Sequence, residues 1–123
     1  MAGNIKFGVV ALDCPDPWGL AQFYGALLGW PVDQGNTPED HWVALHNPDG
    51  GPDICFQRDP GFQAPTWPSN ERAQMAHLDF DVTDIDAEQE RALSLGARLL
   101  DDQPESFRVY ADPAGHPFCL VRA

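Results

Sequence analysis

Apolar side chains recur at three- and four-residue spacing in a short segment near the N-terminus. They are Leu20, Phe23, Tyr24 and Leu27. This spacing places them along one face of a helix. Asp16 is a suitable N-cap, and Pro17 suits the first helical position. Gly29 can adopt the left-handed conformation that ends a helix. The pattern therefore predicts a helix between Asp16 and Gly29.

Strand-like segments lie on both sides of this helix. The segment 5–12 is apolar and rich in β-branched residues, and a short strand is expected near residues 31–34. The segments 41–46 and 53–58 are joined by a turn of the Asn-Pro-Asp-Gly type at 47–50. The pattern predicts a β-hairpin there.

The same order of elements returns in the second half of the chain. A second helix is expected to begin at Asp84 and to end at Gly96. A second hairpin is expected to join 107–111 to 117–122 through the turn 112–115.

Four pairs of segments match between the two halves, in the same order. The pairs are 13–16 with 81–84, 28–30 with 95–97, 47–50 with 112–115, and 54–56 with 118–120. Ordered self-similarity of this kind indicates an internal repeat. We predict one domain, 1–123, with a βαβββ module at 1–58, a linker at 59–74 and a second βαβββ module at 75–123.

The composition narrows the class of protein. The chain has 123 residues, a hydrophobic fraction of 43% and a formal net charge of -12. So acidic a surface repels phosphate groups, which disfavours nucleic acid and membrane surfaces as partners. There is no apolar stretch of the ~20 residues that span a bilayer. Three cysteines without a CxxC pair favour reduced thiols, and we expect a soluble cytoplasmic protein.

Three motifs together resemble a known superfamily. They are Asp16-Pro17 followed by Phe23-Tyr24 and Leu28-Gly29-Trp30, the string from His77 to Asp84, and Asp112-Pro113-Ala114-Gly115-His116-Pro117-Phe118. In this order they resemble the vicinal-oxygen-chelate superfamily of glyoxalases, bleomycin-resistance proteins and dioxygenases, in particular small bacterial glyoxalase-like domains. The resemblance implies an α+β fold in which two βαβββ modules form a cup-shaped mixed sheet, and it suggests a homodimer. Some members bind a divalent metal in the cup, whereas others bind drugs there without one.

The resemblance also implies four metal-ligand positions, which fall here on Val9, Cys55, His77 and Cys119. Valine has no donor atom, and of the four only His77 is a residue type that the superfamily commonly uses. We therefore expect no conventional metal site and no cofactor. The alternative is an unusual site of His77, Cys55 and Cys119, which could bind zinc with an open fourth position in a lyase, isomerase or dioxygenase.

Alternation along a strand places His77 and Asp79 on one face. They are the candidate catalytic residues, since a histidine beside a carboxylate can act as a general acid–base pair. Their alternative role is structural. Five further residues are candidate ligand-binding residues: Trp42, Cys55, Gln57, Trp67 and Cys119. The tryptophans can stack on a flat ligand, and the alternative, ordinary core or subunit-interface packing, is favoured for both.

These observations predict a glyoxalase-like protein that binds a small organic molecule in its cup. Whether it is also an enzyme is left open by the sequence. A non-catalytic structural or regulatory module, with its cup filled by its own side chains, is a further alternative.

Overall fold

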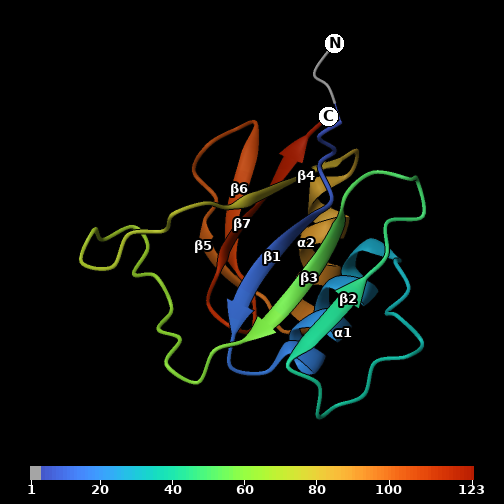
Figure 1. The fold of residues 1–123 in the computed structure, drawn as a ribbon. Coiled ribbons are helices and arrows are strands. Elements are labelled where there is room, and N and C mark those ends of the chain that lie inside the picture. The colour runs from blue at the N-terminus through green and yellow to red at the C-terminus, as the bar shows by residue number, and fades with distance from the viewer. Residues whose placement is uncertain (1–3) are drawn as a thin grey trace. The chain divides into compact units, whose positions relative to one another are not determined.

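The computed structural model describes residues 4–123. Contacts between residues divide the chain into two compact units, one that extends to Phe62 and one that begins at Gln63. Each unit is a small α+β structure with its own sheet and its own helix (Figure 1). Within residues 4–123, neither helix is long and apolar enough to cross a lipid bilayer.

The first unit contains one helix and a three-stranded mixed sheet. Its elements are β1 (Val9–Cys14), α1 (Pro17–Leu28), β2 (Trp42–Leu45) and β3 (Asp53–Arg58). The strand order is β1-β3-β2, with β1 parallel and β2 antiparallel to the central β3. The predicted hairpin is confirmed, although β2 is shorter than the segment 41–46.

Helix α1 begins and ends where the sequence predicts. The Asp16 carboxylate accepts a hydrogen bond from the Gly19 amide at 3.1 Å, which satisfies one of the free amides of the first turn. Gly29 ends the helix with a φ of 72°. The four stripe residues of the helix are buried, and α1 packs on strands β2 and β3.

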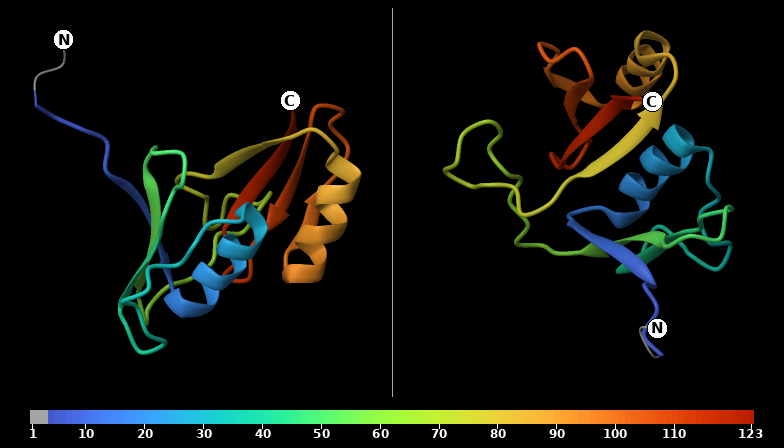
Figure 2. Two further views of the ribbon diagram at one scale, coloured as in Figure 1. Left: turned by 90° about the vertical axis from the view of Figure 1, so that its right-hand side faces the viewer. Right: turned by 90° about the horizontal axis from the view of Figure 1, so that it is seen from above.

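The second unit contains the other helix and a four-stranded mixed sheet. Its elements are β4 (Leu78–Val82), α2 (Ile85–Leu95), β5 (Arg98–Asp101), β6 (Phe107–Ala111) and β7 (Pro117–Arg122). The strand order is β4-β7-β6-β5, and β4 runs parallel to β7. Helix α2 lies along one face of this sheet (Figure 2). The second predicted hairpin has the expected bounds.

The two faces of the second sheet differ in what covers them. Phe118 and Leu120 are buried on the α2 face, and so is Tyr110, whose hydroxyl donates a hydrogen bond to Gln89 of α2 at 2.8 Å. Because side chains alternate along a strand, Cys119 must point to the opposite face. That opposite face carries the candidate site.

The strand expected near residues 31–34 is reduced to one antiparallel bridge, between Val32 and Leu45. Backbone hydrogen bonds flank this bridge, from the Asp33 amide to the Ala44 carbonyl and from the His46 amide to the Pro31 carbonyl. The extended conformation stops at Asp33, because its carboxylate accepts a hydrogen bond from the Gly35 amide and so turns the chain.

Candidate functional site

A cavity of about 370 Å³ lies on the face of the second sheet that is opposite α2. Three strands supply six of its lining residues: Asp79, Phe107, Val109, Pro117, Cys119 and Val121. His77, directly before β4, also lines it, as do Trp67 and Gln74 from the segment that precedes β4. All nine residues belong to the second unit.

Strand register explains why the strand residues meet at this cavity. Asp79 pairs with Cys119 across the parallel β4–β7 ladder, and Cys119 pairs with Val109 across the antiparallel β7–β6 ladder. Paired residues on neighbouring strands share a face. Phe107 and Val121 form the next such pair on this face.

Trp67 reaches the cavity because the segment that carries it folds back on itself. The Thr66 amide donates to the Arg72 carbonyl at 2.8 Å, and the Arg72 guanidinium donates to the Ala64 carbonyl at 3.2 Å. Ala64 also lies so close to the second hairpin turn that a Cβ at Gly115 would be 2.5 Å from the Ala64 Cβ. The absence of a side chain at Gly115 therefore permits this contact.

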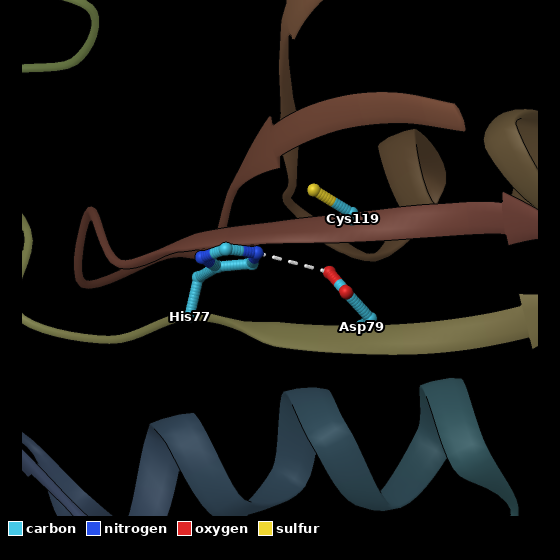
Figure 3. Close-up of side chains that lie close together, drawn as sticks. All are labelled: His77, Asp79 and Cys119. Atoms are coloured by element: carbon cyan, nitrogen blue, oxygen red, sulfur yellow. Dashed lines mark ion pairs between the residues drawn. The ribbon is translucent and has the colours of Figure 1, made fainter. Parts of the chain in front are cut away.

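The polar side chains gather at one part of the cavity (Figure 3). His77 Nε2 lies 3.1 Å from Asp79 Oδ1, and both side chains are about half exposed, at 41% and 56%. Cys119 is buried on the neighbouring strand. A nitrogen of His77, an oxygen of Asp79 and the sulfur of Cys119 all lie within 4.8 Å of one another.

The Cys119 thiol has a strongly perturbed pKa. Burial is the main cause, followed by the charge of Asp79 and a hydrogen bond to it, and together they raise the pKa of Cys119 to about 11. A thiol with this pKa is almost entirely protonated at neutral pH, and the protonated form is a poor nucleophile. Cys119 therefore does not act as an activated nucleophile in the metal-free protein.

Gln74 lines the cavity, and its side chain has a polar atom with unmet hydrogen-bonding capacity. Gln74 Oε1 is buried, and no described residue donates a hydrogen bond to it. Buried carbonyl oxygens of this kind nearly always have a donor in folded proteins. The other walls, formed mainly by Trp67, Phe107, Val109 and Val121, are apolar or aromatic. The cavity therefore presents the His77–Asp79 pair beside an apolar surface.

The other sequence-predicted ligand-binding residues lie in the first unit. Trp42 pairs with Gln57, and Ala44 pairs with Cys55, so Trp42, Cys55 and Gln57 share one face of the first sheet. Trp42 is 44% exposed, whereas Cys55 is buried, and burial is the main cause that raises the pKa of its thiol. The set of Cys55 with His77 and Cys119 spans both units and stays a prediction.

The residues do not fit the metal site that the family resemblance implies. Val9 occupies one of its four ligand positions, and valine has no donor atom. In the second unit, however, Asp79 joins His77 and Cys119, which gives one oxygen, one nitrogen and one sulfur donor. Zinc accepts all three donor types. The sequence predicted Asp79 on this face, but not as a third donor.

Five lining residues were not among the site residues predicted from sequence: Gln74, Phe107, Val109, Pro117 and Val121. For Phe107 and Val109 the signal was available, because the register of a hairpin that turns at 112–115 pairs them with Val121 and Cys119. Gln74 lies in an irregular segment, where no periodicity indicates the direction of a side chain.

Comparison with known proteins supports the same fold. A family model described as a glyoxalase-like domain matches residues 9–121. No curated protein matches the sequence significantly.

Several solved structures share the fold at low sequence identity. A glyoxalase/bleomycin resistance protein/dioxygenase family enzyme from Burkholderia phytofirmans is 17% identical, with a TM-score of 0.74 over 96% of this chain and 98% of its own. A glyoxalase-related enzyme from Fulvimarina pelagi is 21% identical, with a TM-score of 0.68 over 96% and 88%. The fosfomycin resistance protein FosX from Listeria monocytogenes is 17% identical, with a TM-score of 0.71 over 100% and 93%.

Proposed function

Since the chain belongs to the glyoxalase-like domain family, we propose that it binds a small organic molecule in the cavity of its second unit. The observation that carries this proposal is the cavity itself, in which apolar and aromatic walls surround a few converging polar groups. Clefts of this composition are the usual binding sites for small molecules.

The size and walls of the cavity define the kind of molecule. About 370 Å³ is at the lower end of the ~300–1,000 Å³ typical of ligand pockets, which favours a ligand of one or two rings. Trp67 and Phe107 provide aromatic surfaces for a flat, partly aromatic body.

The polar groups define what the ligand carries. Gln74 lines the cavity, and its buried Oε1 has no donor among the described residues, so a rotation of this side chain would let a ligand hydroxyl or amine bond to it. The His77–Asp79 pair can orient a second polar group of the ligand or exchange a proton with it. Binding alone and proton-transfer catalysis are both compatible with this arrangement, and neither needs the conventional metal site.

Calorimetric titration of the full chain with 1-naphthol, in the presence of chelator, tests the proposal. This probe has a two-ring aromatic body and one hydroxyl donor. We expect one site per chain, and binding that weakens at least about tenfold in Val109→Trp, which fills the cavity, and in Trp67→Leu, which removes a wall.

Trp42→Leu is the matched control, because it removes a tryptophan from the first sheet and leaves the cavity unchanged. Its affinity for 1-naphthol should equal that of the wild type. No binding to the wild type, or equal losses in Trp42→Leu and Trp67→Leu, would contradict the proposal.

The homodimer suggested by the family resemblance is a separate proposal. Sedimentation equilibrium at micromolar concentration should give twice the chain mass of 13.5 kDa. A mass equal to one chain would contradict it.

A further inference from the structure

Three side chains with different donor atoms converge at one part of the cavity. Figure 3 shows Asp79 on β4 and His77 directly before this strand, beside Cys119 on β7, and their donor atoms lie within 4.8 Å of one another. We propose that His77, Asp79 and Cys119 form a three-donor site for a thiophilic divalent cation, of which zinc is the best match.

The donor types select the cation. Zinc is bound in proteins by cysteine sulfur, histidine nitrogen and carboxylate oxygen, commonly with four ligands. A thiolate ligand disfavours magnesium and manganese, which prefer oxygen. Three protein donors leave a fourth position that faces the cavity, where water or a polar group of a ligand can bind.

The distances allow such a site after a small adjustment. Zinc bonds of roughly 2.0–2.3 Å in tetrahedral geometry place neighbouring ligand atoms about 3.5 Å apart. His77 Nε2 and Asp79 Oδ1 are already 3.1 Å apart. The sulfur lies within 4.8 Å of both atoms, so the approach that it needs is about 1 Å or less, which rotation of the half-exposed His77 and Asp79 side chains can supply.

The surroundings of Asp79 favour a bound cation. No lysine or arginine is among the described residues that line the cavity, so the carboxylate has no permanently charged partner there. Its neighbours are the His77 imidazole and the Cys119 thiol, which donates a proton toward it. On binding, the cation takes the place of the thiol proton, which is released to the buffer, and the neutral imidazole binds through its unprotonated nitrogen.

The site differs from the one implied by the family resemblance, since it needs neither Val9 nor Cys55 and adds Asp79. It shares the cavity with the proposed organic ligand but does not depend on that ligand. Failure of metal binding would leave the 1-naphthol titration, which is performed in chelator, unaffected. Failure of 1-naphthol binding would equally leave the metal titration valid.

Cobalt(II) is the probe, because it replaces zinc and its absorption reports the ligands. Chelator-treated full-length protein is titrated with cobalt chloride. We expect a sulfur-to-cobalt charge-transfer band in the near ultraviolet that saturates at one cobalt per chain, and that disappears when zinc is added. Equal concentrations of magnesium or manganese should leave it unchanged. The absence of a charge-transfer band would overturn the proposal.

Substitutions identify the donors. Cys119→Ser should abolish the charge-transfer band. His77→Gln and Asp79→Asn should each weaken cobalt affinity more than about 100-fold. This loss exceeds the ~10–100-fold that is usual when a residue that only hydrogen-bonds to a metal ligand is replaced. These two side chains are exposed, so both variants should fold even if the Cys119 variant does not, which far-ultraviolet circular dichroism checks.

Cys55→Ser is the matched control, because it removes another buried cysteine that lies in the first unit. It should retain the full band and the wild-type affinity. Loss of the band in Cys55→Ser would overturn the proposed site in favour of a set that contains both cysteines. Wild-type affinity in Asp79→Asn would overturn the role of Asp79.

Discussion

Asp79 and Cys119 occupy paired positions on the neighbouring parallel strands β4 and β7, and the thiol donates a hydrogen bond to the carboxylate. Pairing places both side chains on the face opposite α2, where the cavity lies. The carboxylate is 56% exposed, while the thiol beneath it is buried. The negative charge therefore stabilises the protonated thiol and disfavours the thiolate.

This relationship predicts slow alkylation of Cys119. Raising the pKa of the thiol from 9.0 to about 11 lowers its thiolate fraction near pH 8 about 100-fold. Chelator-treated protein should therefore react with iodoacetamide at Cys119 at least about 100-fold more slowly than the same residue does in urea-unfolded protein. Peptide mass spectrometry follows the modification. Comparable rates in the two states would show that the thiol is neither buried nor held protonated.

Local sequence signals predicted most of the elements correctly. Helix α1 follows from the Asp16 cap, the apolar stripe and Gly29, because each of these acts within one or two turns of chain. The second hairpin likewise follows from its turn, in which the Asp112 carboxylate accepts hydrogen bonds from the amides of Ala114 and His116. The strand expected at 31–34 is reduced to a single bridge, because the chain turns directly after Asp33, whose carboxylate accepts a hydrogen bond from the Gly35 amide.

The candidate site was less predictable than the fold. Alternation along β4 correctly placed Asp79 on one face with the sheet partner Cys119. The positions of residues in the segment before β4 depend on the path of an irregular backbone, which the sequence does not reveal. No pattern in the sequence therefore indicates where the Gln74 side chain points or that its oxygen is buried. The metal-ligand positions implied by the family resemblance did not include Asp79. They show where other members of the superfamily have ligands and cannot reveal a donor that is particular to this chain.

The buried hydroxyl of Tyr110 should contribute measurably to stability. It donates to Gln89 Oε1 at 2.8 Å and is fully buried beneath α2. Tyr110→Phe removes this bond but leaves Gln89 Oε1 bonded to the Arg108 guanidinium at 3.0 Å. We expect the free energy of unfolding in urea to fall by about 1 kcal/mol, the usual net value of one hydrogen bond.

Cavity binding provides the control for this variant. Tyr110 points to the α2 face, so 1-naphthol affinity in Tyr110→Phe should equal that of the wild type. An unchanged free energy of unfolding would mean that water hydrogen-bonds to Gln89 in place of the Tyr110 hydroxyl at no cost in stability.

His46 should make the stability of the chain depend on pH. Its ring nitrogens lie 2.7 Å from Asp33 and 3.0 Å from Asp53, and the hydrogen bonds to Asp33 and then Asp53 raise the pKa of His46 above 6.5. A raised pKa in the folded state contributes stability that is fully present below about pH 6.5 and is lost as the pH rises through the folded value.

The carboxylates of Asp33 and Asp53 make the stability depend on pH in the acidic range. A hydrogen bond from His46 is the main cause that lowers the pKa of Asp33, and the Asn47 amide, followed by His46, lowers that of Asp53. Their contribution is present above the unfolded value of 3.8 and is lost as the pH falls through the lowered folded values. Stability from this cluster should therefore be greatest between about pH 4 and 6.5.

Urea unfolding of the wild type and of His46→Gln across this range measures the effect. The difference between the two proteins should be largest near pH 5 and should shrink as the pH rises above the folded pKa of His46. Because these side chains are substantially exposed, the difference should also shrink in ~1 M salt. A difference that is independent of pH would assign His46 a packing role only.

Gly115 and Gly50 offer a matched pair of substitutions at equivalent turns of the two repeats. Both have a positive φ, of 96° and 84°, so alanine at either position adopts an unfavourable left-handed backbone that costs about 1–2 kcal/mol. An alanine Cβ at position 50 meets nothing within 4 Å, whereas one at position 115 would lie 2.5 Å from the Ala64 Cβ. Only Gly115→Ala must therefore also displace the segment that carries Trp67.

We expect both variants to lose stability in urea, with the larger loss in Gly115→Ala, and only Gly115→Ala to bind 1-naphthol less tightly. Equal affinities in the two variants would show that the position of Trp67 does not depend on the contact between Ala64 and the turn.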